Sequence, residues 1–151
     1  MRPLFACLTI LLLTGCSSYR GAWQRAKLPP EYPDTLAGRW QGEWRSDKNG
    51  HTGRLRAVFA QGGTGTYQAS FHGVWWRVFG SAYDVEITAT PQPDGSLALA
   101  GERQLFPLGA YRIEGAVRDG VITARYASKA DEGVMELRRA PQGPGRGGEF
   151  L

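Results

Sequence analysis

Residues 36–140 alternate between apolar and polar side chains, and this two-residue period limits the possible folds more than any other feature of the chain. A half-buried strand points successive side chains to opposite faces, whereas an amphipathic helix spaces its apolar residues by three and four. The alternation is clear over residues 54–59, 67–72, 83–88 and 111–117. Turn signals rich in Gly, Asp, Asn and Pro separate these runs, so the pattern predicts antiparallel strands joined by short loops.

Eight strands account for the pattern, in chain order. We predict them at residues 38–45, 53–60, 65–74, 81–90, 96–103, 109–117, 121–127 and 133–139. Consecutive strands with short loops favour an all-β domain over residues 37–140, folded as an eight-stranded antiparallel up-and-down barrel. Eight strands are enough to close a barrel and remove its unpaired edges. A two-sheet β-sandwich satisfies much of the same pattern and stays open as the alternative.

The first predicted strand places Gly38, Trp40, Gly42 and Trp44 on one face. Two large rings separated by glycine suit a narrow barrel interior, where small residues leave room for large ones. This Gly-x-Trp on the first strand resembles the lipocalins and the avidin-like barrels. A longer run, from Trp40 to Gly53, is similar to uncharacterised small secreted bacterial domains, which implies no activity.

The last predicted strand ends in two arginines, Arg138 and Arg139. In the lipocalins an arginine of the final strand packs across the first-strand tryptophan at the closed end of the barrel. The resemblance therefore implies a cation–π contact between Trp40 and one of these two arginines.

The amino-terminal segment carries Arg2 and then an apolar run from Leu4 to Leu13. This is the pattern of a secretory signal, and it is shorter than the roughly 20 apolar residues that span a bilayer. The pair Gly15-Cys16 resembles the lipobox of bacterial lipoproteins. The resemblance implies a signal peptide at residues 1–15, acylation of Cys16 and a membrane anchor made of acyl chains such as palmitate. An ordinary signal peptide with a chance cysteine is the alternative.

The residue after the cysteine is Ser17 and not aspartate. By resemblance to the sorting rule of enteric bacteria, this favours the periplasmic face of the outer membrane over the inner membrane. Cys7 is lost with the signal and Cys16 carries lipid, so the mature chain has no thiol left for a disulfide. We expect a lipid-anchored protein of the cell envelope whose fold depends on its core alone.

Both ends of the mature chain look unlike the strand region. Residues 16–36 contain three prolines and no clear period, which predicts a tether behind the lipidated cysteine. Trp23, Leu28 and Tyr32 are too apolar for a pure linker and are candidates to pack against the domain. Residues 141–151 are rich in Gly and Pro, which is typical of a disordered tail.

The loops of a meander alternate between its two ends, and here the two sets differ. One end receives short turns at 61–64, 91–95 and 118–120, and the other receives longer loops at 46–52, 75–80, 104–108 and 128–132. Binding residues concentrate on loops carried by a rigid scaffold, so we expect the mouth at the second end. Because the first strand begins at the tight-turn end, the tether should lie there and the mouth should point away from the membrane.

The candidate residues for binding a ligand or partner gather on the mouth loops. They are His51, Trp75, Trp76, Phe79, Phe106 and Leu108. One interpretation is an exposed aromatic rim, which suits either a small apolar ligand at the mouth or a protein partner. The other is a hydrophobic lid that folds over the mouth as core. The function hypotheses are therefore a ligand-binding lipoprotein and, as the alternative, an envelope assembly factor or enzyme inhibitor.

The sequence contains no recognisable catalytic or metal-binding pattern, so we expect no enzyme, no metal site and no cofactor. His51 and His72 lack metal-ligand spacing and a third ligand. Asp84 and Glu86 share one strand face, but their outward phase indicates a solvated ion-pair surface. The formal charge of +4 would fall to +3 without Arg2 and is spread along the chain, which speaks against nucleic-acid binding.

Overall fold

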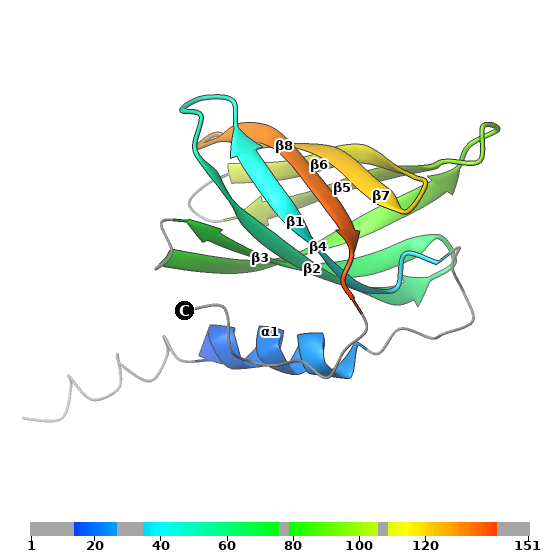
Figure 1. The fold of residues 1–151 in the computed structure, drawn as a ribbon, viewed down its shortest axis with the longest axis horizontal. Coiled ribbons are helices and arrows are strands. Elements are labelled where there is room, and N and C mark those ends of the chain that lie inside the picture. The colour runs from blue at the N-terminus through cyan, green and yellow to red at the C-terminus, as the bar shows by residue number, and fades with distance from the viewer. Residues whose placement is uncertain (1–13, 27–34, 76–78, 106–108, 142–151) are drawn as a thin grey trace, which may run out of the picture.

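The computed structural model describes residues 14–26, 35–75, 79–105 and 109–141 (Figure 1). Within these ranges the elements are α1 (Thr14–Arg25), β1 (Gly38–Ser46), β2 (Thr52–Gly63), β3 (Thr66–Trp75), β4 (Phe79–Pro91), β5 (Leu97–Leu105), β6 (Gly109–Arg118), β7 (Val121–Ala127) and β8 (Glu132–Arg139). The eight predicted strands are all present, and each begins and ends within three residues of its predicted range.

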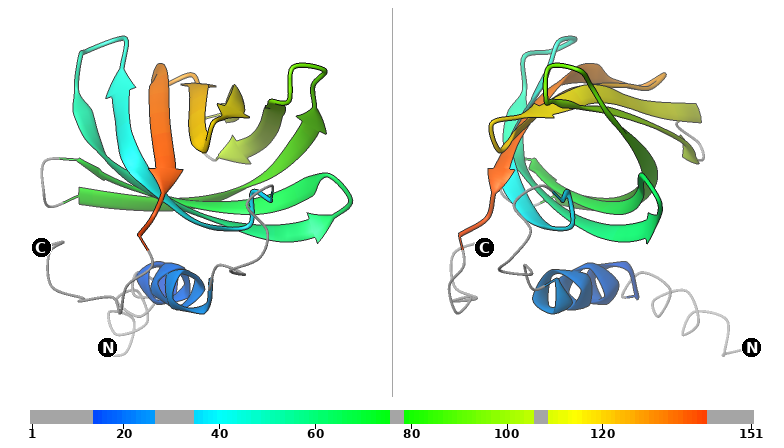
Figure 2. Two further views of the ribbon diagram at one scale, coloured as in Figure 1. Left: turned by 45° about the vertical axis from the view of Figure 1, so that its right-hand side comes forward. Right: turned by 90° about the vertical axis from the view of Figure 1, so that its right-hand side faces the viewer.

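The strands form a closed antiparallel barrel in chain order, β1 to β8 (Figure 2). Ring closure comes from β1 and β8, which pair from Trp40 opposite Arg139 to Ser46 opposite Gly133. The predicted up-and-down barrel is therefore confirmed, and the β-sandwich alternative is wrong. The sandwich fails because β1 and β8 meet as hydrogen-bonded neighbours instead of facing each other across two layers.

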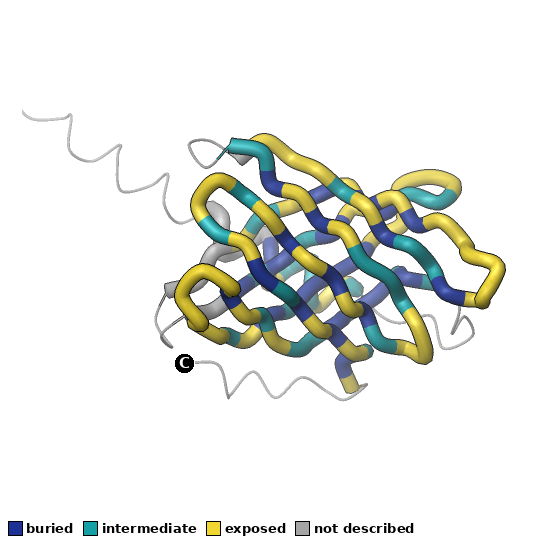
Figure 3. Tube along the Cα trace, turned by 90° about the horizontal axis from the view of Figure 1, so that it is seen from above, coloured by how far each residue is buried: buried dark blue, intermediate teal, exposed yellow. Residues whose placement is uncertain are grey.

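The two-residue period separates a buried interior from a polar outer surface, as Figure 3 shows along the strands. In β2, for example, the inward residues Leu55, Ala57 and Phe59 are only 2%, 0% and 3% exposed. The residue before Leu55, Arg54, points outward and is exposed. Inward residues from all eight strands contribute to one hydrophobic core. The alternation in the sequence thus reports directly which face of each strand is inside.

Two glycine-dependent features hold the ring together. A Cβ on Gly42 would lie 1.9 Å from the carbonyl oxygen of Glu136, so β1 and β8 approach this closely only because residue 42 has no side chain. The β6–β7 turn has positive φ at both Asp119 and Gly120, 51° and 73°, as a two-residue type I′ hairpin requires. These positions fix where the barrel closes and how tightly the strands turn.

The helix α1 was not predicted, because residues 16–36 were expected to form a tether without regular structure. Tyr19 and Trp23, four residues apart, lie on one face of this helix and pack on the outside of the barrel. Two apolar positions give too weak a periodic signal to detect from sequence, and contact with the barrel stabilises the short helix. Among the residues described, no helix is long and apolar enough to cross a membrane.

The contacts of α1 involve cationic and aromatic side chains. The Tyr19 ring stacks on His72 with centroids 4.8 Å apart, and Trp23 lies under Arg56 and Arg39, 4.8 Å and 5.6 Å from their guanidinium carbons. Burial by α1 lowers the pKa of His72, and the charge of Arg56 lowers it further. Trp23 therefore packs against the domain, whereas Leu28 and Tyr32 lie outside the described residues.

Candidate functional site

The barrel has two chemically different ends. The connections between β1 and β2, β3 and β4, β5 and β6, and β7 and β8 lie at one end, which we call the mouth. The other three connections lie at the opposite, tight-turn end, and both ends can be followed in Figure 1. The interior side chains therefore divide into a mouth half and a tight-turn half.

A continuous series of aromatic rings runs through the interior toward the mouth. The ring centroids are 6.3 Å apart for Trp40–Phe59, 6.0 Å for Phe59–Phe71, 5.3 Å for Phe71–Tyr83, 5.0 Å for Tyr83–Tyr111, 6.1 Å for Tyr111–Tyr126 and 6.5 Å for Tyr126–Trp44. These spacings lie in the range of favourable aromatic pairing. The rings in the mouth half are mostly tyrosines, so the polar tips of the series gather there.

The tyrosine hydroxyls of the mouth half make two sets of hydrogen bonds, one between Tyr83 and Tyr111 and one from Tyr126 to Asp131. The hydroxyls of Tyr83 and Tyr111 lie 2.8 Å apart. Tyr126 donates to Oδ2 of Asp131 at 3.0 Å, and Ser46 donates to Oδ1 at 2.6 Å. Asp131 therefore connects β1 to β7 at the mouth.

Burial keeps these phenols protonated. It raises the pKa of Tyr83 to about 12, although the hydrogen bond with Tyr111 lowers it slightly. Burial, together with the neighbouring Tyr83, raises the pKa of Tyr111 further. Burial and the hydrogen bond to Asp131 also raise that of Tyr126. At neutral pH the mouth half therefore offers neutral hydroxyl groups set among aromatic rings.

The ladder between β4 and β5 covers only the tight-turn half of these strands. β4 pairs with β5 from Ile87 to Pro91, whereas it pairs with β3 from Phe79 to Thr88. On the mouth side of Ile87, the described parts of β4 and β5 have no ladder pairing. At the level of Tyr83, β4 and β5 are therefore not joined by ladder pairs, and a side chain can bridge them instead.

Arg103 crosses this open part of the wall. It shares the inward phase of β5 with Leu99 and lies opposite Tyr111 on β6. Its Nη1 donates to the backbone carbonyl of Asp84 on β4 at 2.5 Å, next to Tyr83. A guanidinium therefore bonds β5 to β4 where their ladder has ended, while Arg103 stays exposed to solvent.

The tight-turn end is closed by Leu36, Trp40 and Arg139. The Arg139 guanidinium carbon lies 4.2 Å from the centre of the Trp40 ring, in the cation–π arrangement that the lipocalin resemblance implies. Arg139 also donates to the carbonyls of Ala37, at 2.6 Å, and Thr35. The indole of Trp40 donates to the carbonyl of Leu36 at 2.9 Å, and Leu36 and Trp40 are each 1% exposed.

The second arginine does not share this role. Arg138 lies on the outer surface and pairs with Glu136 at 3.0 Å. Because neighbouring residues of a strand face opposite sides, only one of the two arginines can reach Trp40.

Most of the expected aromatic rim lies outside the described residues. That is the case for Trp76, Phe106 and Leu108, and for the side chains of Trp75 and Phe79, whose backbones pair at the end of the β3–β4 ladder. His51 is exposed on the β1–β2 loop, where its amide donates to Asn49 Oδ1 at 2.9 Å. The structure therefore places His51 at the mouth and leaves the rest of the rim a prediction.

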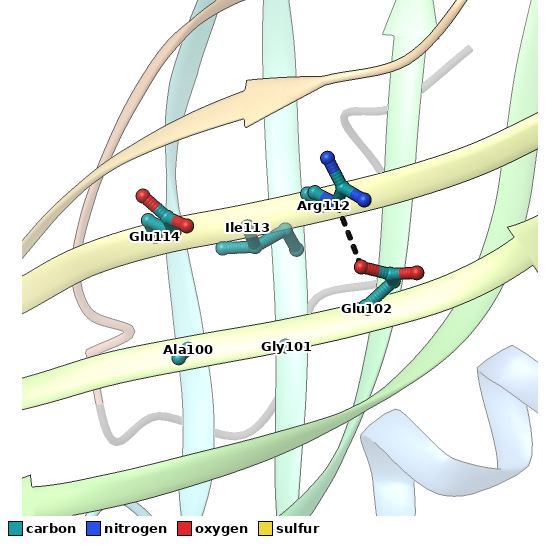
Figure 4. Close-up of a pocket in the computed structure, with 6 residues that line it drawn as sticks. All are labelled: Ala100, Gly101, Glu102, Arg112, Ile113 and Glu114. Atoms are coloured by element: carbon teal, nitrogen blue, oxygen red, sulfur yellow. Dashed lines mark hydrogen bonds and ion pairs between the residues drawn. The ribbon is translucent and has the colours of Figure 1, made fainter.

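A further candidate site lies on the outer wall of the barrel. A depression of about 290 Å³ lies on the outer wall between β5 and β6, where the exposed Arg112 and Glu102 pair at 2.6 Å (Figure 4). Its charged side chains belong to the outward phase and do not reach the mouth. Within the described ranges, no group of three or more His, Cys, Asp or Glu residues is placed to hold a metal ion.

Sequence reasoning missed Arg103 and the role of the tyrosines, although the sequence contains a signal for both. Arg103 interrupts the apolar phase set by Leu97 and Leu99, which marks a position where the interior is polar or open. The alternation over residues 83–88 and 111–117 puts Tyr83 and Tyr111 in the apolar phase, but it does not reveal that their hydroxyls pair. Comparison with protein-family models, with curated proteins and with solved structures finds no match for this chain.

Proposed function

We propose that this protein is a membrane-anchored, non-enzymatic binding lipoprotein of the cell envelope, and that it binds a small, mainly apolar ligand at the mouth of its barrel. The observation that carries the proposal is the placement of Arg103 on the inward phase of β5, opposite Tyr111 and bonded to the carbonyl of Asp84, where the ladder between β4 and β5 has ended. A purely structural core would not need a cation on the inward phase of β5.

The residues around Arg103 favour a ligand with one polar, acidic end. The aromatic rings of Phe71, Tyr83 and Tyr111 supply apolar surface for a hydrocarbon body. A guanidinium binds carboxylate or phosphate oxygens strongly, and neutral phenols can donate further hydrogen bonds to them. We infer an amphiphile whose acidic head lies at Arg103 and whose apolar part enters the aromatic interior.

The anchor rests on the lipobox-like Gly15-Cys16. Acyl chains on Cys16 would hold the mature protein at the membrane because each buried methylene contributes about 0.8 kcal/mol. Ser17 favours the periplasmic face of the outer membrane over the inner membrane. The resemblance of β1 to the first strand of lipocalins agrees with a binding role.

Binding is tested with a dansyl-labelled fatty acid and its uncharged methyl ester, added to the purified mature protein. We expect the acid to bind more tightly than the ester. The substitution Arg103→Gln should weaken binding of the acid by roughly tenfold and leave the ester unchanged, because a charge-assisted hydrogen bond is lost. Arg112→Gln is the matched control, since Arg112 lies on the neighbouring strand but faces outward.

Native mass spectrometry of the protein purified from the envelope then tests for a natural ligand. A discrete extra mass that disappears on denaturation would support the proposal and give the ligand's chemical class. No bound mass and no binding of either probe would refute the proposal. The protein-partner hypothesis would then take its place, tested by capture from envelope extract with Trp75→Ala and Phe106→Ala.

A further inference from the structure

The course of α1 bears on which end of the barrel faces the membrane. α1 runs obliquely along the outside of the barrel, from the mouth side to the tight-turn side (Figure 1). Near its start, Tyr19 stacks on His72, which lies in the mouth half of β3. Just after its end, the Ala26 carbonyl accepts a hydrogen bond of 2.8 Å from Nε of Arg39, the second residue of β1.

These contacts fix the direction of the helix relative to the barrel. Arg39 marks the tight-turn end, because β1 begins there. His72 marks the mouth side, because it lies three positions before Trp75, the last residue of β3. Cys16 precedes Tyr19 by three residues of helix, which is about 4.5 Å along the helix axis, and continues in the direction of the mouth. The backbone of the proposed lipidation site is therefore on the mouth side.

We propose that α1 holds the barrel with its mouth toward the bilayer that carries the acyl chains of Cys16. The inference rests on the lipidation included in the proposed function. It reverses the orientation expected from sequence, in which the tether leaves from the tight-turn end. That expectation assumed an extended segment before β1, whereas the chain first folds back along the barrel as α1.

The charge of α1 agrees with a position at a membrane surface. Arg20 and Arg25 are exposed on the helix, and the segment Thr14–Arg25 contains no acidic residue. Anionic lipid headgroups attract such groups by about 1 kcal/mol for each basic residue near the surface.

This orientation specifies where the ligand comes from. An amphiphile that leaves the same bilayer meets the mouth directly, so its hydrocarbon part need not cross the aqueous space around the barrel. Arg103 and the tyrosine hydroxyls would then receive the acidic head of a membrane lipid or of a fatty acid released from one. The partner surface of the mouth is thus the lipid bilayer, with an acidic amphiphile as its ligand.

The test measures the distance of each end of the barrel from the bilayer. Acylated mature protein is incorporated into vesicles of phosphatidylethanolamine and phosphatidylglycerol, with a fluorophore at Ala130→Cys on a mouth loop or at Gln92→Cys on a tight turn. Both positions are exposed and lie on turns away from α1. Quenching by nitroxide-labelled lipid should be several-fold stronger at residue 130. Equal quenching, or stronger quenching at residue 92, would overturn the orientation.

A pair of helix variants shows whether α1 sets the orientation. The double substitution Tyr19→Ala and Trp23→Ala removes the stacking and cation–π contacts, and we expect it to abolish the difference between the two labels. Tyr19→Phe is the matched control, because it keeps the ring and removes a buried hydroxyl that has no hydrogen-bond partner in the described part of the chain. It should preserve the difference, and its loss in this variant would contradict the role of the stacked ring.

Failure of the anchor is distinguishable from failure of the orientation. If Cys16 is not acylated, the mass of the mature protein lacks acyl chains and the protein does not remain with the vesicles. That result would refute the lipidation on which the inference rests. An acylated protein that remains with vesicles but shows no preference between the two labels would refute the orientation alone.

Discussion

The tight-turn end and the mouth of the barrel use an arginine side chain in opposite ways. At the tight-turn end, Arg139 binds the backbone carbonyls of Thr35 and Ala37 and lies over Trp40, so its donors serve the fold. At the mouth, Arg103 makes a hydrogen bond to Asp84 and remains exposed next to Tyr83. One arginine completes a closed structure, and the other stands where the wall is open.

The proposed binding role requires a small barrel that is stable and still offers surface to a ligand. A fully filled eight-stranded barrel has little room for a ligand, because its interior is only wide enough for side chains. Leu36 and Trp40 fill the tight-turn half, where they are almost completely buried. The ladder between β4 and β5 ends in the other half, which is where we place the proposed binding surface.

The largest effect should come from removing the ring at the tight-turn end. We expect Trp40→Ala to lower the free energy of unfolding by about 3–5 kcal/mol, because it leaves a cavity and removes the partner of Arg139. Urea unfolding of the mature protein measures the change. Trp44→Ala is the matched control at the mouth, where the ring is half-buried, and it should cost clearly less. Equal losses would mean that the two ends contribute alike to stability.

A smaller effect is expected for the paired hydroxyls of the mouth. Tyr83→Phe should cost about 1 kcal/mol, because it leaves the hydroxyl of Tyr111 without this partner. The double variant Tyr83→Phe, Tyr111→Phe should cost less than the sum of the two single variants, since neither hydroxyl is then left alone. Unfolding in urea gives all three values. Simple additivity would show that the two hydroxyls do not interact.

The tyrosines of the mouth should lose their protons only at a pH well above the usual pKa of a phenol. Burial raises the pKa of Tyr83 to about 12, so its neutral form contributes stability fully below the unfolded pKa of about 10. That contribution is lost as the pH rises through about 12. Ultraviolet absorbance of phenolate should therefore show late-titrating phenols, with one fewer in Tyr83→Phe. Titration of every phenol near pH 10 in the folded protein would contradict their burial.

The smallest effect should appear in acid at the tight-turn end. Hydrogen bonds from Ser96, and then the ion pair with Arg118, lower the pKa of Asp94 to about 2. The carboxylate therefore contributes stability above its usual pKa near 3.8, and this contribution is lost as the pH falls through about 2.

Urea unfolding of the native protein and of Asp94→Ala at a series of pH values measures this contribution. The difference between the two proteins should shrink between pH 4 and pH 2. Arg118→Gln should keep most of the acid dependence, because Ser96 is the larger cause. A difference that persists unchanged at pH 2 would show that the carboxylate charge has no part in it.

Local pattern was sufficient to predict the barrel but not its functional details. Alternation along each strand identifies the inward face, and short turns leave an up-and-down order as the simplest arrangement. The separation of β4 and β5 depends instead on the residue at which their ladder ends, and the sequence of neither strand alone indicates that residue. α1 was missed because its contacts with His72 and Arg56 are tertiary, and two aromatic residues do not make a period.

The choice between two adjacent arginines illustrates the same limit. The sequence places Arg138 and Arg139 at the end of the last strand, and the resemblance allows either to reach Trp40. The register of β1 against β8 sets Trp40 opposite Arg139 and turns Arg138 outward. A one-residue shift would exchange their roles, so the assignment required the structure.

The pairing of β1 with β8 also decides when this protein can fold. Arg139 bonds to Ala37 across 102 residues of sequence, and the ring cannot close before β8 is available. Contacts between distant parts of a chain slow folding and leave strand edges exposed until they form. If the chain is exported as proposed, its β1 edge must wait unpaired until the last strand has emerged. Protection of that waiting edge, by a chaperone or by fast transit, then becomes a condition for obtaining the folded protein.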